Sequence, residues 1–68
     1  MTVASNVKQT LASLKGIEST LKIYSVQSRN EEERAVYKEE LQIVEAVIKD
    51  IENRLKILEF EEPQYKGN

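Results

Sequence analysis

The sequence contains no cysteine and no histidine. Without cysteine, no disulfide can cross-link the chain and no thiolate can bind a metal ion. Without histidine, the usual zinc sites lack a ligand, and a mechanism that uses an imidazole base is excluded. We therefore expect no catalytic residues, no metal site and no cofactor, and we interpret the protein as one that is not an enzyme.

Neither charge sign dominates, because ten basic residues against twelve acidic ones give a net charge of -2. The sequence thus lacks the basic footprint of a nucleic-acid-binding protein, and we expect no nucleic-acid partner. No apolar run approaches the roughly eighteen residues that a transmembrane helix requires. Residues 1–16 lack the charged start and apolar run of a signal peptide, so we expect a cytoplasmic protein.

The chain has only 68 residues, which is room for one small domain. A chain of this size usually needs a disulfide, a metal or a partner subunit to be stable. Since the composition argues against the first two, we expect the protein to form an oligomer.

The strongest pattern lies in the second half of the chain, where apolar residues recur at alternating steps of four and three. This spacing predicts an α-helix over about 31–61, with one apolar side suited to packing on another helix. The residues of this seam are Tyr37, Leu41, Val44, Ile48, Ile51, Leu55 and Leu58.

The first half repeats the rhythm and predicts a helix over about 3–27. Gly16 lies inside this helix and costs about 1 kcal/mol relative to Ala. It is either a tolerated weak point or a place where another backbone approaches closely. The predicted seam consists of Val3, Val7, Thr10, Leu14, Ile17, Leu21 and Tyr24, with Leu11 beside it.

A short polar stretch at about 28–30 separates the two helices. Asn30 followed by Glu31, Glu32 and Glu33 is typical of a helix start, because Asn caps well and acids favour the positive end of the helix dipole. A cation site is the alternative, but adjacent helical residues point apart. So short a connection makes the helices antiparallel. The predicted fold class is therefore all-α, a two-helix hairpin in which Tyr24 meets Tyr37.

The second helix carries a second apolar stripe beside its seam. A broad face packed on a single helix is one interpretation, but two helices share only one line of contact. We favour the other interpretation, a homodimer that forms a four-helix bundle. The residues predicted to form the dimer interface are Val36, Ile43, Val47, Ile57, Ile23 and Val26.

Charged residues recur every seven positions. The basic row of the first helix consists of Lys8, Lys15, Lys22 and Arg29, and the acidic row of the second consists of Glu45, Glu52 and Glu59. The antiparallel register predicts the ion pairs Lys8–Glu52 and Lys15–Glu45, which contribute ~0–1 kcal/mol each. They would help to select the antiparallel arrangement. A functional alternative is that the basic row binds an anionic membrane surface.

Pro63 ends the second helix and leaves a tail over residues 62–68. Gln64, Tyr65 and Lys66 are candidates for binding a partner as an extended peptide. The alternative is that Tyr65 folds back over the start of the first helix.

The two ends of the chain, MTVASNVKQTLASLKG at 1–16 and EEPQYKG at 61–67, resemble the opening and closing signatures of a family of small proteins from Bacillus-type spore formers. This is the domain-of-unknown-function family numbered sixteen fifty-seven. The resemblance is tight at the ends and loose from about Ile17 to Glu59. It implies no catalytic residues. It does imply a role in spores, at the spore core or the periphery of the inner membrane, with a membrane protein of that membrane as partner.

These observations lead to one favoured function and one alternative. The favoured function is a non-enzymatic helical interaction protein that docks on a membrane-protein partner. The alternative is a peripheral protein that binds anionic membrane surfaces through its basic row.

Overall fold

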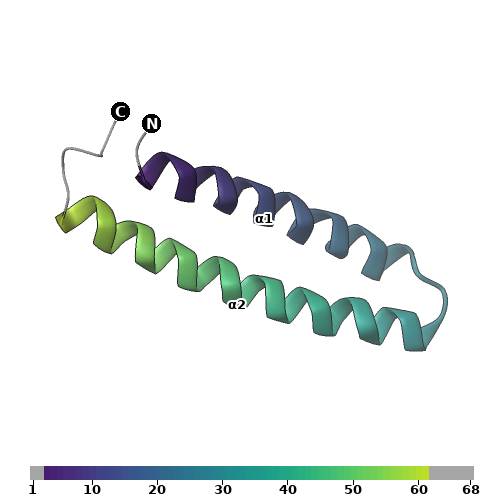
Figure 1. Ribbon diagram of the computed structural model, residues 1–68. Coiled ribbons are helices and arrows are strands. Elements are labelled where there is room, and N and C mark those ends of the chain that lie inside the picture. Colours follow the sequence, from purple (N-terminus) through teal and green to yellow (C-terminus); the bar gives the residue numbers. More distant parts are fainter. Residues whose placement is uncertain (1–2, 62–68) are drawn as a thin grey trace.

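The computed structural model describes residues 3–61, which form two α-helices. Helix α1 (Val3–Gln27) and helix α2 (Glu31–Glu61) lie side by side and run in opposite directions, so that α1 begins and α2 ends at the same end of the rod (Figure 1). No strand is present among the described residues. The predicted all-α hairpin is therefore confirmed.

The turn between the helices is held by side chains that the sequence singled out. The Asn30 side-chain oxygen accepts hydrogen bonds from the backbone N–H groups of Glu32 at 2.8 Å and Glu33 at 3.3 Å. These are two of the donors that a helix start leaves without a partner. The Ser28 hydroxyl lies 3.3 Å from both a Glu33 carboxylate oxygen and the Asn30 carbonyl, so it can donate to either acceptor. Asn30 is thus the cap of α2.

Arg34 connects the start of α2 to the end of α1. Its guanidinium donates a hydrogen bond of 3.2 Å to the Ser28 carbonyl oxygen, just beyond the last residue of α1. The positive charge there favours the negative end of the α1 dipole. Arg34 therefore fastens the two helices together at the turn.

The seam predicted for α2 is the side of α2 that packs on α1. Ile48 is buried, and the other six seam residues are half-buried. The predicted contact next to the turn is also present, since the ring centroids of Tyr24 and Tyr37 lie 5.7 Å apart. The register at this end is therefore confirmed.

The seam predicted for α1 is half wrong. Val7, Leu14 and Leu21 do face α2, but the other four predicted residues are exposed, namely Val3, Thr10, Ile17 and Tyr24. The helix is rotated relative to the prediction. The shielded residues of α1 are Ala4, Ser5, Val7, Leu11, Leu14, Glu18, Leu21 and Ser25.

The hairpin has very little interior. Among the described residues only Ala4, Ser25 and Ile48 are buried, and Ile48 is the single large apolar one. Helices this long usually gain most of their stability by burying an apolar face. In the hairpin, the apolar residues of α2 beside the seam remain about half exposed.

Gly16 makes no close contact with the rest of the described chain. A Cβ built on Gly16 would meet nothing within 4 Å. Within the hairpin, Gly16 is therefore a weak point of α1 and not a point of close backbone approach.

Candidate interaction surfaces

The contact between the helices divides the hairpin into two long flanks. Successive helical residues are about 100° apart, so the residue after each of Val7, Leu14 and Leu21 lies on one side of the seam. The residue before each of Ala4, Leu11, Glu18 and Ser25 lies on the other side. These two rows differ completely in chemistry.

The first row is basic, and we call this side the charged flank. Lys8 lies 3.1 Å from Glu59, and Lys15 lies 3.2 Å from Glu52, both across the helix contact. The predicted pairs joined each lysine to the glutamate one heptad nearer the turn and are wrong. A seven-residue repeat leaves neighbouring glutamates equivalent in the sequence, so the pattern could not distinguish them.

The remaining basic residues lie nearer the turn. Lys22 lies 3.8 Å from Glu18 of its own helix, and Arg29 is exposed in the turn. The lysine side chains of the row keep 51–57% of their surface accessible. Such exposed pairs stabilise a fold by ~0–1 kcal/mol each. The basic row is therefore accessible, with an acid beside each of its three lysines.

The opposite side is the apolar flank. On α1 it carries Val3, Ile17 and Tyr24, which are 53%, 49% and 48% exposed. On α2 it carries Val47, with Val36, Ile43 and Ile57 in the next row outward. Those four residues are 40–57% exposed. The structure thus places four of the six predicted interface residues on one flank, next to an α1 row that was predicted to be seam.

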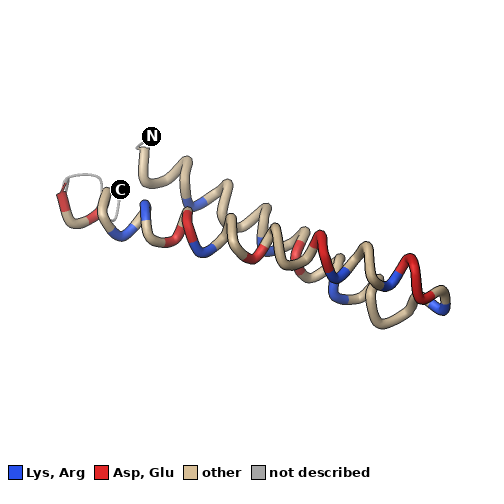
Figure 2. Tube along the Cα trace, turned by 90° about the horizontal axis from the view of Figure 1, so that it is seen from below, with Lys and Arg blue, Asp and Glu red and all other residues tan. Residues whose placement is uncertain are grey.

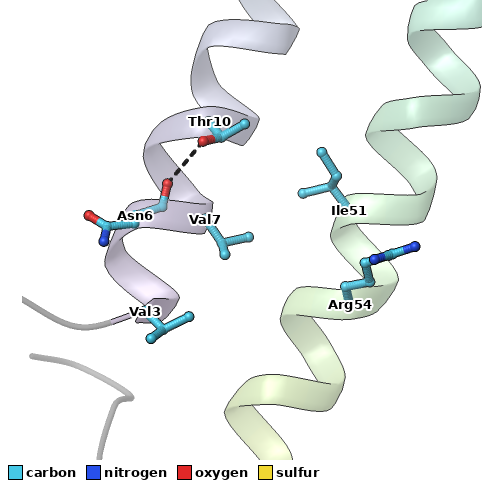
Figure 3. Close-up of a pocket in the computed structure, with 6 residues that line it drawn as sticks. All are labelled: Val3, Asn6, Val7, Thr10, Ile51 and Arg54. Atoms are coloured by element: carbon cyan, nitrogen blue, oxygen red, sulfur yellow. Dashed lines mark hydrogen bonds between the residues drawn. The ribbon is translucent and has the colours of Figure 1, made fainter.

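The apolar flank includes a shallow groove where α1 begins. The groove has a volume of about 250 Å³ and is lined by Val3, Asn6, Val7, Thr10, Ile51 and Arg54. Figure 3 shows Val7 and Ile51 pointing toward one another across it, while the Thr10 hydroxyl is turned back to the Asn6 carbonyl of its own helix at 3.2 Å. Because the lining is mostly apolar, the groove suits an apolar side chain.

Two predicted interface residues lie elsewhere. Ile23 is 53% and Val26 is 83% exposed. Both follow the helical rotation around to the outer face of α1, where they line a hollow with Lys22 and Gln27. The structure therefore does not bring them together with the apolar flank.

Sequence reasoning missed Ala4, Glu18 and Ser25 on α1 and Arg34 on α2, which all lie at the helix contact. On each helix they continue the four-three spacing of the contact residues, but their side chains are small or polar. Ala4 and Ser25 are small enough for the helices to approach, and the Ser25 hydroxyl bonds the Lys22 carbonyl at 3.0 Å.

Three further expectations concern a metal site, a membrane-spanning helix and the residues after Glu61. Between residues 3 and 61, no group of three or more acidic side chains is arranged to hold a metal ion. Neither α1 nor α2 is long and apolar enough to cross a membrane. The partner-binding candidates Gln64, Tyr65 and Lys66 lie outside the described residues.

Comparison with known proteins yields one match. The family described as protein of unknown function (DUF1657) matches residues 7–55. The matched region includes much of the middle of the chain, where the resemblance is loose, and it stops before the closing signature. No curated protein and no solved structure matches the chain.

Proposed function

Because the chain belongs to the DUF1657 family, whose function is unknown, we propose a function from its surfaces: a non-enzymatic helical interaction protein that works as a homodimer. The observation that carries the proposal is the contrast between a nearly absent interior and a half-exposed apolar flank. Burying apolar surface contributes roughly 25 cal/mol per Å². A second hairpin would complete a four-helix bundle and supply the missing core.

Light scattering tests the homodimer directly. The expected result at micromolar concentration is twice the 7.8 kDa mass of one chain. Melting temperature should also rise with protein concentration, because dimerisation stabilises the folded state by mass action. A monomer mass together with a concentration-independent melting temperature would contradict the proposal.

We also propose that the dimer binds a membrane protein of the spore inner membrane through Gln64, Tyr65 and Lys66. Support for the spore context comes from the family resemblance alone, and support for the segment comes from its aromatic residue beyond the end of the helix. Tagged protein should recover that partner from sporulating cells, and Tyr65→Ala should abolish recovery without lowering the melting temperature. Recovery by the variant at the level of the unchanged protein would contradict the assignment.

The alternative function is binding to anionic membranes through Lys8, Lys15, Lys22 and Arg29. The exposure of the lysines favours it, but Glu59, Glu52 and Glu18 lie beside them and reduce the local positive potential. Co-sedimentation with vesicles of anionic lipid separates the two functions. Binding at low salt that is lost at high salt would favour the membrane function, and its absence would favour the interaction protein.

A further inference from the structure

We propose that the second copy lies on the apolar flank with both turns at the same end of the bundle, so that α1 of each chain packs on α2 of the other. This inference rests on the proposed homodimer and specifies which surface forms it and in which orientation. In this arrangement every pair of neighbouring helices is antiparallel, as in up-down-up-down four-helix bundles.

The flank has the size that a stable interface needs. The hairpin measures 49 × 16 × 11 Å between Cα atoms, and the flank is its broad side because it spans both helices. That footprint is roughly 800 Å², which is about the area that each partner buries in a standard protein–protein interface.

The chemistry of α1 on this flank also fits a second copy. All its polar residues there are uncharged, namely Asn6, Thr10, Ser13, Thr20 and Gln27. The lysines of α1 all lie on the charged flank, and Glu18 lies in the seam. The α1 side can therefore be covered without burying a charge of its own.

The apolar residues match in the same-end orientation. Tyr24 and Tyr37 set the common height of α1 and α2, and a two-fold axis parallel to the rod keeps these heights. Opposite the α1 residues, the partner's α2 then presents apolar residues at three layers: Val3 meets Ile57, Ile17 meets Ile43, and Tyr24 meets Val36.

The charged residues of α2 on this flank then meet uncharged residues of the other chain. In the same register Glu40 lies opposite Thr20, Asp50 opposite Thr10, and Arg54 opposite Asn6. Asp50 and Arg54 also neutralise one another within α2, since Arg54 Nε lies 3.0 Å from an Asp50 carboxylate oxygen.

The opposite-end orientation fits poorly. It would pack α1 on α1 and α2 on α2, each pair antiparallel. In the register centred on residue 45 of α2, this sets Val36 against Arg54, Ile57 against Glu33, and Asp50 against Glu40. Two apolar residues would face charges and two acids would face each other, which is unfavourable. In this register the same-end orientation is therefore favoured.

Distances between the two turns test the orientation. Because the chain has no cysteine, Arg29→Cys gives one attachment point for a spin label in an exposed turn. In the same-end dimer the two labels should lie within about 30 Å, because a bundle two helices wide is roughly 20–25 Å across. In the opposite-end dimer they should lie about as far apart as the 49 Å length of the hairpin.

The mass of the labelled protein separates the possible failures. A dimer mass with a short label distance supports the inference. A dimer mass with a distance near the rod length overturns the orientation and leaves the proposed function standing. A monomer mass overturns both.

A matched pair of variants tests the surface. Ile43→Asp and Ile23→Asp make the same change at residues that are 56% and 53% exposed, one on the apolar flank and one on the outer face of α1. We expect the dimer dissociation constant to rise at least about tenfold for Ile43→Asp and less than about threefold for Ile23→Asp. Equal effects, or a larger effect at Ile23, would overturn the assignment. If Ile43→Asp does not fold, Ile17→Thr keeps a β-branched residue and should still weaken the dimer.

Discussion

The two flanks of the hairpin differ in how far their side chains already have partners within the same chain. On the charged flank, Lys8 and Lys15 reach acids of the other helix within one chain. On the apolar flank, residues such as Ile17 and Ile43 have half their surface in water. Water or a neighbouring side chain can supply the hydrogen bonds that a polar group needs, whereas apolar surface leaves water only by contact with other apolar surface. In the hairpin the lysines of the charged flank therefore already have partners, while the apolar flank remains exposed to water.

The contrast also explains the composition of the helices. Figure 2 shows charged residues distributed along α2, whereas α1 is mostly uncharged. In α1 the bases are confined to a single row, so the rest of the helix can contact other helices. The difference teaches that confining the bases of α1 to one row leaves the rest of that helix without positive charge.

The largest expected effect comes from placing the same charge on each flank in turn. Ile43→Asp should reduce dimer stability by on the order of 2–3 kcal/mol, because it buries an unpaired carboxylate. Lys15→Asp should cost less than about 1 kcal/mol, because its pair with Glu52 is exposed. Sedimentation equilibrium of both variants measures the difference. The comparison of flanks would fail if Lys15→Asp dissociated the dimer more.

A smaller effect is expected at the turn, which belongs to neither flank. Asn30→Ala removes the acceptor for the Glu32 and Glu33 backbone N–H groups. Loss of such a cap costs about 1 kcal/mol. Denaturant unfolding should show the loss at every protein concentration, while the dimer mass stays unchanged. A loss of dimer with intact stability would mean that the turn contributes to the interface.

A gain of similar size is expected at Gly16. Replacing it with Ala should raise the free energy of unfolding by about 0.5–1 kcal/mol, because a Cβ has open space and Ala favours the helix. Thermal melting measures the gain. A weakened dimer in this variant would place a second backbone against Gly16 and contradict the orientation proposed above.

The smallest expected effect is that of salt. Raising ionic strength from about 0.05 M to 1 M should change stability by less than about 1 kcal/mol, because it screens only the exposed pairs of the charged flank. The dimer mass should be unchanged, since its interface is apolar. Dissociation at high salt would show that ion pairs, and not the apolar flank, hold the chains together.

The sequence was sufficient to predict α2 and the turn, and it misplaced the rotation of α1. In α2 only one four-three pattern consists of large apolar residues, so the seam is unambiguous. In α1, Val7, Leu14 and Leu21 belong to two competing patterns. The more apolar pattern continues with Ile17 and Tyr24, and it therefore predicts the seam at the wrong rotation of the helix.

In the structure the less apolar pattern faces α2, and it continues through Leu11 and Ser25. That rotation brings the basic row of α1 to the acids of α2, and the small Ser25 fits at a crowded contact. The residue pattern of one helix reveals neither the ion pairs nor the fit of Ser25, because both depend on the helix packed against it. The apolar flank could therefore be predicted only in part: its α2 residues were found, while its α1 residues were assigned to the seam.

The single turn has a consequence for the order in which this protein folds. Tyr24 and Tyr37 flank the turn and can meet after a short loop closes, whereas Lys8 and Glu59 lie near opposite ends of the sequence. Loop closure costs more entropy for longer loops, so we expect the hairpin to zip from the turn outward. Amide hydrogen exchange should then be slowest near the turn-proximal layers and faster toward the open end. The turn, where the Asn30 cap and the Arg34 contact lie, is thus the end at which we expect folding to begin.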